Sequence, residues 1–236
     1  MADAKTFVLV HGAWHGGWCW RRVGNLLERR GHKVFAPTLT GLGERSHLLS
    51  KEVDLDTHIT DVVNLIRWEE LTDIVLVGHS YGGFVISGVA ERAEPAIAAI
   101  VFLDAFVPEH GDSMASHGTP ATRERVLVAV DQGETSIPPR SAESFNVNAA
   151  DRAWVDRRCT PQPIGCFLGR LALTGARERI ARKAYIRATG YPNPVFDQAA
   201  AMLKSRPGWS VHGIPCGHDV MVDRPGDLAE LLEQMA

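Results

Sequence analysis

The sequence has no apolar run long enough to cross a membrane. Its longest apolar stretch, Ala96–Leu103, is less than half of the roughly 20 residues that a transmembrane helix needs. The apolar run Phe7–Val10 is likewise too short for the central segment of a secretory signal peptide. We therefore expect a cytoplasmic protein that does not insert into membranes.

Paired cysteines and an excess of one charge are also missing. The four cysteines show no CxxC pair and no metal-ligand spacing, which suggests reduced thiols; they are Cys19, Cys159, Cys166 and Cys216. The net charge of -3 gives no electrostatic reason to expect a nucleic-acid partner. With 45% hydrophobic and 22% charged residues, the 236-residue chain fits one globular domain with a sizeable core. A homodimer is left open.

Short runs rich in β-branched residues alternate with segments of helical apolar spacing. Six runs are short enough to be buried strands: Phe7–Val10, Lys33–Ala36, Ile74–Val77, Ile97–Leu103, Ala184–Ile186 and Trp209–His212. Between them, spacings such as Ile59, Val62 and Ile66 predict helices. This alternation predicts an α/β fold, with a mostly parallel sheet of about six strands and helices on both faces.

The segment 109–182 interrupts the alternation. It is too long for a simple connection, its helical signal is patchy, and it carries Pro138, Pro139, Pro161 and Pro163. We interpret 109–182 as a cap inserted into a core formed by 1–108 and 183–236.

The segment Asp73–Gly83 reads DIVLVGHSYGG and contains the pattern G-x-S-x-G between an apolar run and a helical stretch. In this setting the pattern predicts a sharp turn that exposes a serine, with glycines at 78 and 82 because side chains there would collide with neighbouring backbone. Ser80 is therefore the candidate nucleophile. The N–H of Tyr81, at the start of the following helix, is a candidate oxyanion donor.

A serine hydroxyl is a weak nucleophile until a base takes its proton. In enzymes with this turn, the acid and the histidine follow the serine in that order along the chain. His218 lies in the loop after the last predicted strand and is the candidate base. The neighbouring His212 lies within or at the end of that strand.

The acid has more than one candidate. Asp104 directly follows the strand Ile97–Leu103 and would lie at the carboxyl edge of the sheet, beside the strand that delivers the serine. Asp197 also satisfies the chain order, but it falls in a predicted helix. Asp219 is adjacent to the histidine, and consecutive side chains rarely face each other. We prefer Asp104.

A glycine-rich segment, HGAWHGGW at His11–Trp18, follows the first predicted strand. Acyl transfer places negative charge on the carbonyl oxygen, and each fixed N–H that binds it is worth roughly 10²- to 10³-fold in rate. We assign the Ala13 N–H to this role, together with that of Tyr81. His11 and His15 are spaced four apart, yet neither HExxH nor a nearby carboxylate completes a metal site. No metal or cofactor is expected.

With HGAWHGGWCW, GHSYGG and GHDVMVDRP present, the chain resembles the esterase and hydroxynitrile-lyase branch of the α/β-hydrolases. That branch includes plant methyl esterases and bacterial carboxylesterases such as pyrethroid hydrolases. The plant members carry the acid in a T-x-D pattern where this chain has Thr189-Gly190-Tyr191, a departure that favours Asp104. The lyases have Thr in place of Gly12 and Lys in place of Asp219. The resemblance therefore implies ester hydrolysis rather than cyanohydrin cleavage.

The sequence thus predicts a serine carboxylesterase that hydrolyses a small, largely apolar ester through an acyl-enzyme. Candidate substrate contacts are Trp14, His79, Phe106 and Phe167. Two alternatives stay open: a lyase or cofactor-free oxygenase that uses the same His/Ser pocket, and a non-catalytic receptor for a small ligand.

Overall fold

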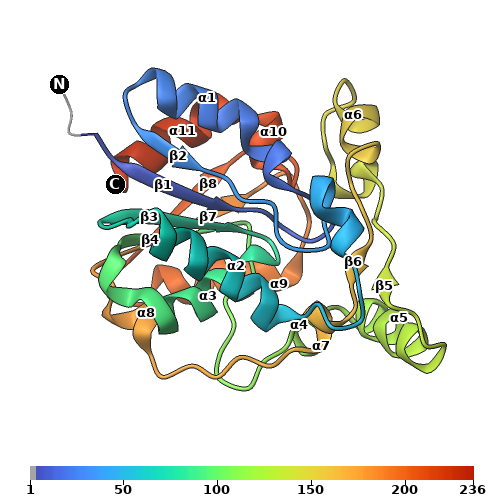
Figure 1. Cartoon of the computed structure of the whole chain (residues 1–236). Coiled ribbons are helices and arrows are strands. Elements are labelled where there is room, and N and C mark those ends of the chain that lie inside the picture. Colours follow the sequence, from blue (N-terminus) through green and yellow to red (C-terminus); the bar gives the residue numbers. More distant parts are fainter. Residues whose placement is uncertain (1–3) are drawn as a thin grey trace.

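The computed structural model describes residues 4–236 and contains a six-stranded sheet (Figure 1). The strand order is β2-β1-β3-β4-β7-β8, and every neighbouring pair is parallel. The strands are β1 (Thr6–Val10), β2 (Lys33–Phe35), β3 (Ile74–His79), β4 (Ile97–Leu103), β7 (Arg182–Ala188) and β8 (Trp209–Ile214). All six predicted strands are present, so the predicted fold class is confirmed.

Helices cover both faces of the sheet. Figure 1 shows α1 and α11 on one side and α2, α3 and α9 on the other. The helices of the sheet layer are α1 (Arg21–Arg29), α2 (Leu55–Trp68), α3 (Gly82–Ala93), α9 (Pro194–Lys204), α10 (Val220–Asp223) and α11 (Pro225–Gln234). Every residue of β3 is buried, because layers of helices lie on both of its faces. Within residues 4–236, no helix has the length and apolar character that a membrane span requires.

The segment that we interpret as a cap forms short elements between β4 and β7. They are α4 (Met114–His117), α5 (Pro120–Asp131), β5 (Ser136–Ile137), α6 (Arg152–Asp156), β6 (Gln162–Pro163), α7 (Gly165–Leu168) and α8 (Ala176–Arg179). Figure 1 shows α5, α6, β5 and β6 beyond one end of the sheet, whereas α8 packs on α3 of the core. The first three residues of the predicted core lie outside the described residues.

The register between β3 and β4 sets the level at which two candidate residues leave the sheet. His79 is paired with Leu103, so Ser80 and Asp104 follow at the same height on neighbouring strands. Leu103 is paired in turn with Ile186 of β7. Because all of these strands are parallel, their carboxyl ends meet at one edge, where ligands bind in open α/β sheets.

Gly83 provides a test of this packing, because it lies where the first turn of α3 meets the loop after β4. A Cβ at Gly83 would lie 2.0 Å from the carbonyl oxygen of Phe106, and only a backbone shift can relieve that contact. We predict that Gly83→Ala lowers the free energy of unfolding by about 2 kcal/mol or more, measured by urea denaturation. Gly226→Ala is the matched control in the first turn of α11. Its Cβ would meet nothing within 4 Å, and the change should raise stability by up to about 1 kcal/mol. Equal effects of the two substitutions would contradict the packing.

Candidate active site

Ser80 lies in a strained turn between β3 and α3. Its φ is 54°, in the left-handed region, and its N–H donates to the Leu103 carbonyl at 3.2 Å. The flanking glycines have no room for side chains. A Cβ at Gly78 would lie 2.6 Å from the Gly82 oxygen, and one at Gly82 would lie 2.9 Å from the Val10 oxygen. The turn therefore needs both glycines, as the sequence predicts.

His218 and Asp104 are in direct contact. The Nδ1 atom of His218 lies 2.6 Å from Oδ2 of Asp104, and both residues are buried. A carboxylate accepts only, so Nδ1 carries a proton, and in the neutral imidazole the lone pair is then on Nε2. The histidine is thus held in the form that can take a proton through Nε2.

Arg187, which no sequence motif marks, binds the other oxygen of the same carboxylate. Its guanidinium lies 2.6 Å from Oδ1 of Asp104, and the N–H of Ala188 donates to that oxygen at 3.0 Å. Asp197, the alternative acid, contacts Arg187 at 3.0 Å instead of His218, and its side chain is 64% exposed. The signal that could have found Arg187 is a charged residue inside an apolar strand, because a buried guanidinium requires an anionic partner.

Ser80 and His218 line the same narrow cavity of about 90 Å³. Three of the four predicted substrate contacts lie on its wall: Trp14, Phe106 and Phe167. The cavity is also lined by further aromatic and apolar side chains: Met114, Val126, Ile137, Phe145, Tyr191, Val195 and Phe196. Polar groups are fewer: His117, Thr119, Thr122, Arg125, Arg140 and Asn193. A mostly apolar wall with a few polar groups is typical of small-molecule sites.

His79, the fourth predicted substrate contact, lies beneath the histidine of the site and not on the cavity wall. It is completely buried, its ring centroid is 4.5 Å from that of His218, and its Nε2 donates to the His218 carbonyl at 3.0 Å. We therefore interpret His79 as a support for the His218 loop rather than as a substrate contact.

The glycine-rich loop after β1 passes directly against Ser80. A Cβ at Gly12 would lie 2.9 Å from the Cβ of Ser80, so the neighbouring Ala13 is close to the serine. Trp14 turns the loop with a φ of 67°. Tyr81 is the N-cap residue of α3, its ring is fully buried, and its hydroxyl lies 3.1 Å from Nδ1 of His58.

The two histidines weighed as a metal pair are each bound to protein groups. His11 donates from Nδ1 to the Gly12 carbonyl at 2.8 Å and accepts at Nε2 from the Leu39 N–H at 3.0 Å. His15 faces the Ala13 carbonyl at 2.8 Å and the Asp219 carboxylate at 3.0 Å. Neither ring has a nitrogen left to ligate a metal ion.

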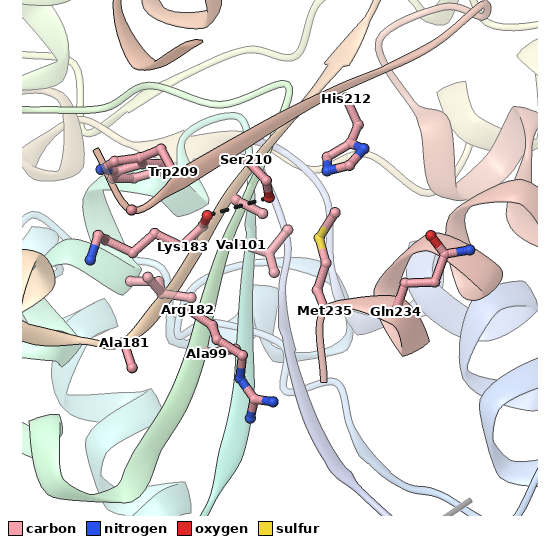
Figure 2. Close-up of a pocket in the computed structure, with 13 residues that line it drawn as sticks. Ala99, Val101, Ala181, Arg182, Lys183, Trp209, Ser210, His212, Gln234 and Met235 are labelled. Carbon is pink, nitrogen blue, oxygen red and sulfur yellow. Dashed lines mark hydrogen bonds between the residues drawn. The ribbon is translucent and has the colours of Figure 1, made fainter. Parts of the chain in front are cut away.

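His212, the rival of His218, faces a different hollow. Figure 2 shows it on β8, opposite Met235 and Gln234 at the end of α11. This hollow of about 480 Å³ lies against β4, β7 and β8, and Ser80 does not line it. The hydroxyl of Ser210 donates there to the Lys183 carbonyl at 3.5 Å (Figure 2). His212 is therefore not placed to serve Ser80.

Comparison with known proteins agrees with this geometry. Residues 7–231 match the family described as the alpha/beta hydrolase family. The chain belongs to that family. This hydrolase is 48% identical to the carbendazim hydrolyzing esterase of Nocardioides sp. (strain SG-4G), over 96% of this chain and 98% of that protein. The relation places it among the carboxylic ester hydrolases and confirms the predicted resemblance.

Two further likenesses are more distant. The hydrolase is 38% identical to salicylic acid-binding protein 2 of Nicotiana tabacum, over 46% of this chain and 42% of that protein. An extracellular alpha/beta-hydrolase from a Paenibacillus species has a TM-score of 0.87 at 24% identity, covering 98% of this chain and 99% of that one. The structural likeness shows the shared fold.

Burial keeps several histidines around the site neutral. It lowers the pKa of His11 to about 3, the pKa of His58 to about 4, and the pKa of His79 well below its usual value. On unfolding each returns toward 6.5, so below that pH the unfolded chain binds more protons than the folded one. Burial also acts to lower the pKa of His15, but Asp219 outweighs it and the pKa is raised. The contribution of His15 to the free energy of unfolding is therefore complete below pH 6.5 and is lost as the pH rises through its folded-state pKa.

We predict that the free energy of unfolding rises with pH between about 4.5 and 6.5, where the unfolded state holds the extra protons. His58→Gln should reduce this slope by about one proton, because the amide cannot titrate. Urea denaturation at a series of pH values measures both slopes. A slope that His58→Gln leaves unchanged would show that His58 is not held neutral by burial.

Proposed function

We propose that this hydrolase is a serine carboxylesterase that cleaves a small, largely apolar ester through an acyl-enzyme. In this scheme Ser80 is the nucleophile, His218 the general base and Asp104 the acid that orients the imidazole. The observation that carries the proposal is the 2.6 Å contact between His218 and Asp104, made while His218 and Ser80 line one cavity.

The steps follow from the proton positions. Ser80 Oγ attacks the ester carbonyl while Nε2 of His218 takes its proton, and the carboxylate of Asp104 stabilises the resulting imidazolium. The imidazolium then gives the proton to the departing alcohol, which leaves an acyl group on the serine. Water, activated by the same Nε2, releases the carboxylic acid and restores the serine.

The N–H groups of Ala13 and Tyr81 are proposed to bind the oxyanion. Both belong to backbone that is fixed against Ser80: the loop at Gly12 by close contact, and Tyr81 by its place at the start of α3. Donors fixed in advance stabilise charge without having to reorganise. The contact of Gly12 with the serine also leaves no room for the threonine of the lyase branch, which favours ester cleavage.

The substrate class follows from the cavity. A volume of about 90 Å³ with aromatic walls admits a small, flat or short apolar group. The esterase relative from Nocardioides is named for carbendazim hydrolysis. We therefore include carbendazim, beside short-chain p-nitrophenyl esters, as a candidate substrate of this hydrolase.

Ser80→Ala tests the nucleophile. We expect kcat for p-nitrophenyl acetate to fall by roughly 10⁴- to 10⁶-fold with binding largely retained, because the acyl-enzyme cannot form. A fluorophosphonate probe should label the native protein and leave this variant unlabelled, as read by intact mass. Near-normal turnover by the variant would refute the mechanism, and failure of the probe to label the native protein would favour the lyase or oxygenase alternative.

Asp104→Asn and Asp197→Asn together test the acid. Asp104→Asn should lower kcat by roughly 10⁴-fold, because an amide favours the wrong tautomer of the histidine. Asp197→Asn loses the same charge at an exposed position and should keep kcat within about threefold. Unfolding curves of both variants separate lost catalysis from lost structure. A larger loss at position 197 would reverse the assignment.

A further inference from the structure

A buried ion pair joins the two loops that carry Ala13 and His218. His15 Nε2 lies 3.0 Å from Oδ2 of Asp219, and neither side chain is more than 2% exposed. Asp219 directly follows His218, and His15 comes two residues after Ala13. The pair therefore connects positions that are 204 residues apart in the chain at the edge of the site.

Both ring nitrogens of His15 face acceptors. Nδ1 lies 2.8 Å from the Ala13 carbonyl oxygen, and Nε2 faces the carboxylate. Since neither acceptor brings a proton, each nitrogen carries its own, and His15 is an imidazolium. The ring of Trp18 stacks on it, with centroids 5.3 Å apart and planes at 22°. The ring therefore has one fixed orientation.

The peptide group between Ala13 and Trp14 is held from both sides. Its carbonyl accepts from His15, and its N–H donates to Oε1 of Gln162 at 3.0 Å. The positive φ of Trp14 means that the loop would relax without such bonds. Rotation of this peptide would move Ala13 relative to Ser80, which the preceding Gly12 contacts.

The Asp219 end of the pair is equally fixed. The N–H of His218 donates to the Phe145 carbonyl at 2.8 Å, and His79 binds the His218 carbonyl. Within the described residues, Oδ1 of Asp219 has no hydrogen-bond partner, so His15 supplies the main compensation for this buried charge. Stability alone does not explain this buried carboxylate. Replacing a buried ion pair with apolar residues of similar volume is often neutral or stabilising.

We propose that His15 and Asp219 form a positioning pair, which holds the Ala13 N–H and the His218 loop in register around Ser80. Neither side chain touches the reacting atoms, and both act through the backbone next to them. The inference rests on the proposed function, since it assigns the Ala13 N–H to the oxyanion. It adds that the alignment of this donor depends on a charged contact with the neighbour of His218.

The double variant His15→Leu/Asp219→Leu tests the proposal, because it removes the pair without leaving a buried charge. We expect it to fold, with kcat for p-nitrophenyl acetate lower by roughly 10- to 100-fold, the effect of a misplaced group, and KM within about threefold. Affinity for a trifluoromethyl ketone, which forms a tetrahedral adduct with the serine, should fall in parallel with kcat.

A rescue variant keeps the test decisive. In His15→Asn/Asp219→Leu, the amide occupies the position of Nδ1 and can still donate to the Ala13 carbonyl, so kcat should recover by about tenfold over the Leu/Leu variant. His32→Asn is the matched control, since it breaks another histidine–carboxylate contact, at 2.9 Å from Glu233 and away from the site, and should leave kcat unchanged.

Three outcomes would overturn the inference: a Leu/Leu variant with native kcat, a loss confined to KM, or an Asn variant no better than Leu. If the Leu/Leu variant fails to fold, the Asn variant is compared with the native protein instead, and a kcat loss that the ketone affinity does not follow would overturn the inference. Fluorophosphonate labelling of the native serine does not depend on this pair. A labelled enzyme whose pair variants keep full kcat would therefore refute this inference alone and leave the proposed function intact.

Discussion

The geometry of the site depends on the carboxylate of Asp104. It is fully buried, and an unsolvated charge is tolerated only where hydrogen bonds and opposite charge replace the lost water. One oxygen binds His218, and the other binds Arg187 and the N–H of Ala188. Those donors come from the loop after β8 and from β7, so one charge joins the ends of β4 and β7 to the histidine loop. His218 keeps one orientation because the buried Asp104 carboxylate requires a hydrogen bond from its Nδ1.

Three residues of the loops around the Asp104 carboxylate have strained backbone conformations. Trp14, Ser80 and Asp104 follow the ends of β1, β3 and β4, and each has a positive φ. Such conformations cost on the order of 1–3 kcal/mol each and persist where surrounding contacts impose them. The bonds from Ser80 N–H to Leu103 and from Asp104 N–H to Ile186 impose them at Ser80 and Asp104. The parallel sheet therefore does more than support the site, because its last hydrogen bonds hold the turns that expose the serine and aim the carboxylate.

Local patterns predicted what depends on local structure. The strands, the glycines at 78 and 82, and the loop positions of Ser80 and His218 all follow from periodicity and from turn geometry within a few residues. Arg187 and Asp104 are 83 positions apart in the chain, and His15 and Asp219 are 204 positions apart. No rule of local spacing predicts contacts between residues so far apart. Asp219 is a poor candidate for the acid because neighbouring side chains diverge. That divergence is what allows it to reach His15 while His218 faces Asp104. The short strands β5 and β6 were missed because two residues each carry no period.

Trp14 contacts both the cavity beside Ser80 and the segment 109–182, which we interpret as a cap. The ring of Trp14 lines the cavity, and its indole N–H donates to the Ile137 carbonyl at 3.0 Å. The backbone of Trp14 binds Gln162 through its N–H and accepts from the Thr160 N–H at 2.9 Å through its carbonyl. A change in segment 109–182 that reshapes the cavity therefore also displaces the peptide group between Ala13 and Trp14. Because the core can stay constant while this segment varies, a shared fold does not by itself specify the ester. The same bonds limit how far segment 109–182 can diverge before the backbone that we propose as the oxyanion donor moves relative to Ser80.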